Sequence, residues 1–136
     1  MFEGFAHVWT PVTVASRLGK QPLAVELAGE KLVFFRGRDG KVGALHDRCP
    51  HRGVQLSLGS VSPSGCLACP FHGWEFDLDG KACYVPLNPD AKLDRLGATA
   101  LPAREIGGLL WVYTAPGPAP SEPVVPDTLS NPKLAR

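Results

Sequence analysis

The chain has 136 residues, of which 44% are hydrophobic and 20% charged, and its formal net charge is +1. This length suits one domain with one core, and the absence of any basic run excludes a protein that binds nucleic acid through a basic stripe. No apolar stretch approaches the ~20 residues that a membrane helix needs. Residues 1–7 also lack the basic start and apolar run of a secretory signal, so we expect a soluble, cytoplasmic protein.

The 15 glycines and 14 prolines are dispersed along the chain, and no helical periodicity runs for long. Short alternating segments between turn residues predict an all-β protein of antiparallel sheets. Asp39-Gly40 and Asp79-Gly80 predict tight hairpins, and Gly59 and Gly65 mark further turns. We predict strands at residues 9–14, 22–27, 31–36, 42–46, 66–68, 74–78, 81–85, 103–106 and 109–114.

Two short segments carry the candidate chemistry. Residues 49–53 read CPHRG and residues 69–74 read CPFHGW, so each segment supplies one cysteine and one histidine. Two soft thiolates and two imidazoles that converge on one point favour an iron–sulfur or zinc centre over magnesium or calcium. The sequence therefore predicts a metal centre held by two loops.

The order of the ligands distinguishes the two metals. A zinc finger usually pairs Cys with Cys in one loop and His with His in the other, at wider spacing than that between Cys49 and His51. Loops that mix the two ligand types favour a two-iron cluster. One iron then takes Cys49 and Cys69, and the other takes His51 and His72.

These residues resemble the cluster-binding loops of Rieske proteins. They are most similar to the N-terminal Rieske domain of Rieske non-haem iron oxygenases, which hydroxylate aromatic rings or remove O-methyl groups. The resemblance runs from about Trp9 to about Pro126 and implies a Rieske-type [2Fe-2S] cofactor. It implies a Rieske fold at 1–115, with antiparallel sheets in a sandwich-like base and a cluster-binding subdomain inserted at about 47–86. A Pro-rich C-terminal tail is expected at 116–136.

The resemblance also suggests supporting residues around the cluster. Gly53 and Gly73 either let loop N–H groups approach the cluster closely or only serve the turns. Trp74 occupies the position where high-potential members carry a serine that donates a hydrogen bond to the cluster. It either covers the cluster or gates the electron route. We expect a low reduction potential, near the bottom of the range of about −150 to +300 mV for such clusters.

Other polar or reactive residues receive structural interpretations. We expect Cys66 and Cys83 to be small buried hydrophobic residues, without a disulfide. His46, at a strand end, is expected to be half-exposed. Asp47 and Arg48 are expected to form a surface ion pair that contributes little stability.

The resemblance implies an electron relay to a mononuclear iron held by two His and one carboxylate. Only His7 and His46 remain once His51 and His72 are assigned to the cluster. We therefore expect no catalytic iron site in this chain and no catalysis by it alone. The expected partners are an electron-donating reductase or ferredoxin and an oxygenase catalytic domain or subunit. Two alternatives stay open: a free-standing Rieske ferredoxin and a metal-stabilised binding module without a redox role.

Overall fold

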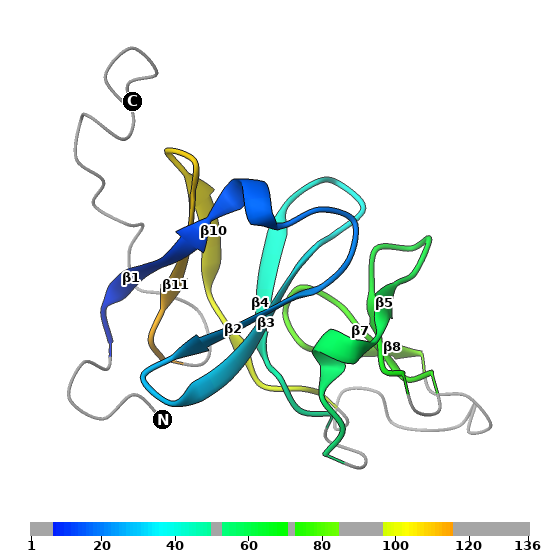
Figure 1. The fold of residues 1–136 in the computed structure, drawn as a ribbon. Helices are drawn as coiled ribbons and strands as arrows, with labels where there is room; N and C mark the ends of the chain where they lie inside the picture. The colour runs from blue at the N-terminus through cyan, green and yellow to red at the C-terminus, as the bar shows by residue number, and fades with distance from the viewer. Residues whose placement is uncertain (1–6, 50–52, 71–72, 85–96, 116–136) are drawn as a thin grey trace.

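The computed structural model describes residues 7–49, 53–70, 73–84 and 97–115. Eleven strands form three sheets within these residues, and all strand pairings are antiparallel (Figure 1). The described segments contain only two short 3₁₀ helices, η1 (Ala15–Arg17) and η2 (Leu56–Leu58). The predicted all-β fold class is confirmed.

The three sheets are named sheet A, sheet B and sheet C, in the order in which their first strands occur. Sheet A joins two distant parts of the chain, because its first strand pairs with its last. Sheet A, in the order β1-β11-β10, contains β1 (Trp9–Val14), β10 (Ala103–Ile106) and β11 (Leu109–Tyr113). Sheet B, in the order β2-β3-β4-β9, contains β2 (Leu23–Leu27), β3 (Glu30–Arg36), β4 (Val42–His46) and β9 (Ala100–Leu101). Sheet C, in the order β5-β6-β7-β8, contains β5 (Ser60–Val61), β6 (Leu67–Ala68), β7 (Glu75–Phe76) and β8 (Ala82–Tyr84).

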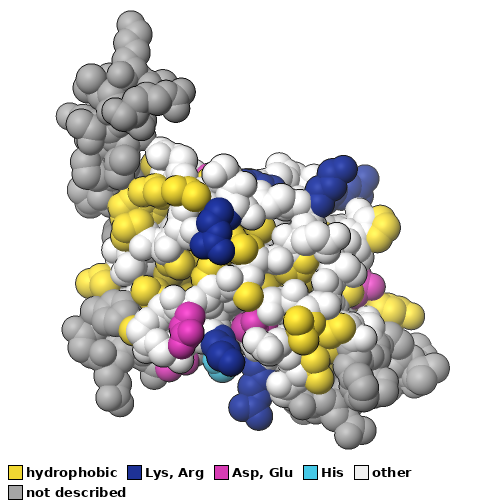
Figure 2. Space-filling model, viewed as in Figure 1, with side chains coloured by type: hydrophobic (Ala, Val, Ile, Leu, Met, Phe, Trp, Pro, Cys, Tyr) yellow, Lys and Arg dark blue, Asp and Glu magenta, His cyan; other side chains and the backbone are white. Residues whose placement is uncertain are grey.

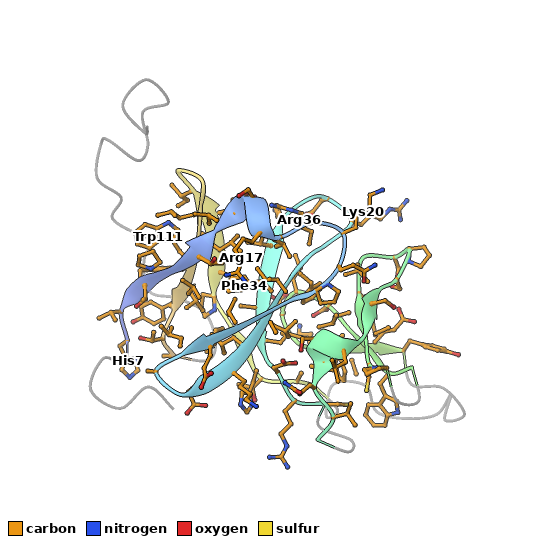
Figure 3. All side chains as sticks on the ribbon, viewed as in Figure 1. His7, Arg17, Lys20, Phe34, Arg36 and Trp111 are labelled. Carbon is orange, nitrogen blue, oxygen red and sulfur yellow. The ribbon has the colours of Figure 1, made fainter. Side chains whose placement is uncertain are left out.

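Sheet B lies between the other two sheets (Figure 1). The apolar run of β3 explains this position, because a strand without polar alternation must bury both of its faces. Leu32 and Phe34 pack in a core with side chains of sheet A, and Figure 3 labels Phe34 in this region. Val33 and Phe35, on the opposite face, pack in a second core with side chains of sheet C. We call the first of these the sheet A core and the second the sheet C core.

Three hairpin loops share one backbone plan. In loops 37–41, 62–66 and 77–81, the N–H of the first residue donates to the carbonyl of the fifth at 2.8–2.9 Å. The fourth residue is a glycine with positive φ in each case: Gly40 (85°), Gly65 (84°) and Gly80 (82°). Asp39 and Asp79 keep negative φ, so the loops are not two-residue type I′ turns, which need positive φ at both central residues. The hairpins predicted at the two Asp-Gly pairs are confirmed.

Sheet C packs against sheet B through the tips of its hairpins. A Cβ atom added at Gly65 would lie 2.3 Å from the backbone nitrogen of Arg38, and one added at Gly43 would lie 2.7 Å from Cδ2 of Leu78. The carbonyl of Gly80 accepts a hydrogen bond of 2.6 Å from the N–H of Ala98. Glycine at these positions permits the close approach that fixes sheet C, and with it the loops it carries, on the central sheet.

Some boundaries differ from the sequence predictions. The strand predicted at 74–78 is shortened to β7, because a hairpin loop begins at Asp77, and the short strands β5 and β9 were not predicted. The predicted limits of the cluster-binding subdomain stay a prediction, as does the limit of the domain itself. The predicted tail at 116–136 lies outside the described residues.

Replacement of Gly65 by alanine tests the packing of sheet C on sheet B. Gly65→Ala should lower stability by about 2–3 kcal/mol, because left-handed strain of ~1–2 kcal/mol adds to a clash with the Arg38 backbone. Gly29→Ala provides the matched control, since Gly29 also has positive φ (82°) but nothing lies within 4 Å of its added Cβ. Urea unfolding midpoints of the cluster-loaded proteins measure both effects. Equal losses in the two variants would contradict the packing role.

Candidate metal centre

The two predicted ligand loops close with the same backbone hydrogen bond, although they lie far apart in the sequence. The N–H of Cys49 donates to the carbonyl of Val54 at 2.8 Å, and the N–H of Cys69 donates to the carbonyl of Trp74 at 2.6 Å. The residue before each acceptor is a glycine with positive φ, 75° at Gly53 and 71° at Gly73. Glycine adopts this conformation without a Cβ penalty. Each loop therefore begins at a cysteine and closes five residues later.

Both cysteines are buried in the sheet C core. Cys49 is 1% exposed and Cys69 is 5% exposed, and both belong to one contiguous cluster of packed side chains. Strand β4 leads to the first loop and β6 leads directly to the second, so the central sheet and sheet C each deliver one cysteine. The structure thus brings the two predicted sulfur ligands into one water-excluding core.

The described part of the centre fits a cluster with one thiolate from each loop. All four cysteines lie in the described ranges and none forms a disulfide, so the two core sulfurs remain able to bind metal. Soft thiolates in an apolar setting suit iron–sulfur chemistry. His51 and His72 lie outside the described residues, so the complete ligand set stays a prediction.

Trp74 closes the second loop with its backbone and covers the core with its ring. The side chain is half-buried against the sheet C core, and its ring centroid lies 6.5 Å from that of Phe76 at an interplanar angle of 40°. Trp74 thus shields the core that contains both cysteines, and its predicted role as a cover of the cluster stays a prediction. Its role in electron transfer, like those of Gly53 and Gly73, stays a prediction.

The predicted surface ion pair of Asp47 and Arg48 is wrong, because Asp47 is buried. Its side chain is 4% exposed, and its carboxylate accepts hydrogen bonds from the N–H (2.7 Å) and the hydroxyl (2.6 Å) of Ser57. The Arg48 guanidinium lies against the first loop, where a Cβ added at Gly53 would be 3.2 Å from its Nε. Sequence reasoning missed Asp47 because its partner lies in a 3₁₀ turn, beyond the ligand loop.

Cys66 and Cys83 are not the buried hydrophobic residues that the sequence predicted. Cys66 is half-buried and Cys83 is exposed, and neither belongs to the sheet C core. Although Cys83 is exposed, its partial burial raises the pKa of the thiol to about 12, and a side-chain hydrogen bond with Cys66 acts in the same direction. Negative charge on Asp77 and Glu75 adds to the shift. Cys83 therefore keeps its proton at neutral pH.

The remaining histidines lie apart from this core. His46 is half-exposed, as predicted, with its Nε2 at 3.9 Å from Oε2 of Glu30. The His7 ring lies edge-on to Tyr113, with centroids 6.4 Å apart. In the described part of the chain, no three His, Cys, Asp or Glu side chains gather as a metal site.

Comparison with known proteins agrees with this geometry. The family profile of the Rieske [2Fe-2S] domain matches residues 8–100. The oxygenase subunit of tert-butanol monooxygenase / tert-amyl alcohol desaturase from Aquincola tertiaricarbonis is 41% identical over 128 residues, which cover 93% of this chain and 27% of that protein. The phthalate 4,5-dioxygenase oxygenase subunit of Pseudomonas putida is 39% identical over 123 residues, covering 87% and 28%. The crystal structure of dicamba monooxygenase bound to dicamba aligns with a TM-score of 0.82 at 32% identity, over 93% of this chain and 38% of that one.

The family match, together with the all-β fold and the two cysteine loops, defines an iron–sulfur protein of Rieske type. The chain belongs to the Rieske [2Fe-2S] domain family, and its cofactor is a Rieske-type [2Fe-2S] cluster. The zinc interpretation is thereby set aside. The chain spans only 20% to 30% of the length of the curated relatives that it matches.

The surface and secondary structure add two observations. No helix in the described ranges is long and apolar enough to cross a membrane. On the face shown in Figure 2, Lys and Arg side chains lie at several separate places rather than in one patch. This distribution agrees with the near-zero net charge of the chain.

The raised pKa of Cys83 predicts an unusual pH dependence of its alkylation. In the native protein, its reaction rate with iodoacetamide should rise about tenfold per pH unit until the pH reaches about 12, because thiolate is the reactive form. In the unfolded protein the rate should level off above about pH 8.5. Peptide mass spectrometry identifies the alkylated cysteine. In Cys66→Ala, the pH at which the Cys83 rate levels off in the native protein should fall part of the way towards that of the unfolded protein. Levelling near pH 8.5 in the native protein would show that the Cys83 thiol is not shifted.

Proposed function

We propose that this chain is the electron-relay domain of a Rieske-type oxygenase system. It would hold its cluster through Cys49, His51, Cys69 and His72 and deliver single electrons to a mononuclear iron in a catalytic domain or subunit. The observation that carries this proposal is the pair of matching loops, each beginning at a buried cysteine. The relatives support it, because several are named as oxygenase subunits.

The protein's contribution to electron transfer lies in rigidity and exclusion of water. The cluster, when bound, supplies a one-electron couple. Cys49 and Cys69 would anchor it as thiolates inside the sheet C core, whose apolar side chains keep water from the sulfurs. The hydrogen bonds that close the two loops restrain the ligands, and small ligand movement favours fast transfer.

The two histidines would face the partners. We expect each imidazole to bind through one ring nitrogen and to direct the other outward, away from the buried cysteine side. An electron donor, a reductase or a ferredoxin, and an electron-accepting catalytic domain would dock at this side. The substrate of the system would be bound by that catalytic domain and not by this chain.

An electron-transfer assay separates this proposal from a free-standing ferredoxin. The dithionite-reduced protein is mixed in a stopped-flow instrument with two acceptors: an oxygenase catalytic domain without a Rieske domain, and a complete oxygenase that has its own. A relay domain reduces the first acceptor. A ferredoxin reduces only the second, and that result would overturn the proposal.

The ligand set predicts which substitutions remove the cluster. Cys49→Ala, Cys69→Ala, His51→Ala and His72→Ala should each lower iron and acid-labile sulfide from about two per chain to near zero. Cys83→Ala is the matched control and should keep both, because Cys83 is exposed and lies outside the core that contains Cys49 and Cys69. Retention of a full cluster in any of the four ligand variants would contradict the assignment at that position.

The position of Trp74 predicts a low midpoint potential, near the bottom of the range that starts at about −150 mV. Trp74→Ser should raise the potential relative to Trp74→Ala, because both lose the ring but only serine supplies a hydroxyl donor. Protein-film voltammetry of the three proteins measures the difference. Equal potentials in the serine and alanine variants would show that no hydroxyl at this position reaches the cluster.

A further inference from the structure

Asp47 is the only charged side chain that is fully buried in the described residues. Burial of an ionised carboxylate is unfavourable unless hydrogen bonds compensate for the lost hydration. Among the described residues, its carboxylate accepts two hydrogen bonds, both from Ser57, at 2.7 Å from the N–H and 2.6 Å from the hydroxyl. This arrangement lies two residues before Cys49, where the first ligand loop begins.

The carboxylate joins two elements that have no backbone pairing with each other. On one side, the N–H of Asp47 donates to the carbonyl of Lys31 at 2.9 Å, which ties the residue to the end of the central sheet. On the other side, Ser57 belongs to η2, whose Leu56 is completely buried in the same core as Cys49. The hydrogen bonds from Ser57 therefore close residues 48–56, which include the first ligand loop.

The second ligand loop needs no such closure. It is flanked by β6 and β7, which pair directly, with Ala68 opposite Glu75 at the base of the loop. The first loop leaves β4, which pairs with β3 and β9, and enters a 3₁₀ turn instead of a partner strand. Each loop has its own hydrogen bond from the cysteine N–H to the carbonyl five residues later. Only the second loop also has a pair of hydrogen-bonded strands at its base.

We propose that Asp47 is a positioning residue, whose double hydrogen bond with Ser57 replaces the missing strand pair and holds the first ligand loop in its cluster-binding shape. This inference rests on the proposed assignment of Cys49 as a ligand. Asp47 does not touch the cluster in this scheme and acts through the loop. Its negative charge also lies two residues from a ligand and opposes the uptake of an electron.

The test measures how fast the loaded protein loses its cluster to an iron chelator. Asp47→Asn, which keeps the size but loses the charge and one acceptor oxygen, should lose it at least about tenfold faster, the factor that corresponds to 1.4 kcal/mol of hydrogen bonding. Ser57→Ala should have a smaller effect, about threefold, since the bond from the Ser57 N–H remains. Ser57→Thr keeps the hydroxyl and should restore the wild-type rate.

A matched control, the EPR line shape and the midpoint potential distinguish the positioning role from a general loss of stability. Asp77→Asn also removes a carboxylate that accepts backbone N–H groups, from Asp79 and Lys81, but in an exposed turn of sheet C. It should leave cluster loss unchanged. In Asp47→Asn, the EPR line shape of the reduced protein should change and the midpoint potential should rise, whereas Asp77→Asn should alter neither.

The outcomes test the Asp47–Ser57 hydrogen bonds separately from the electron-relay proposal. Equal rates of cluster loss in Ser57→Ala and Ser57→Thr would overturn the positioning role, even if Asp47→Asn fails to fold. The positioning role would also be overturned if Asp47→Asn lost its cluster no faster than Asp77→Asn. In both cases the wild-type protein would still load and reduce its cluster, so the proposed function would stand. A wild-type protein that binds no cluster would overturn both proposals.

Discussion

The burial of sheet B on both faces is the constraint from which the rest of the structure follows. A strand with four consecutive large apolar residues, Leu32 to Phe35, cannot expose either face to water without losing hydrophobic stabilisation. One face requires sheet A and the other requires sheet C, which explains the three layers. The two cysteines lie in the second of these cores. The metal centre is thus attached to the best-buried part of the domain.

The two ligand loops have the same inner hydrogen bond but are held at their base by different contacts. Both begin at a buried cysteine and use a left-handed glycine to bring the chain back to the cysteine N–H. Sheet C supports the second loop with paired strands, while a carboxylate and a serine close the first. A loop pair of this kind limits ligand movement, which suits a protein whose proposed task is to pass electrons without rearrangement.

The sequence predicted the parts of the molecule that depend on local pattern. The spacing of Cys and His marked both loops, the Asp-Gly pairs marked two hairpins, and the apolar run of β3 marked a strand. Strands of two residues, such as β5 and β9, have too little periodicity to be recognised. The burial of Asp47 depends on Ser57, which lies ten positions away with the ligand loop between them. The exposure of Cys83 depends on which face of a bulged strand points outward, and sequence alternation does not give this.

The central claim is a two-iron centre with sulfur ligands on one iron and nitrogen ligands on the other. Pulsed EPR of the dithionite-reduced protein tests it most directly, with one sample at natural abundance and one grown with ¹⁵N-labelled histidine. Two histidine nitrogens bound to iron should give strong couplings that change from ¹⁴N to ¹⁵N patterns in the labelled sample. A reduced signal without histidine couplings, or a protein that holds one zinc ion and gives no signal, would contradict the claim.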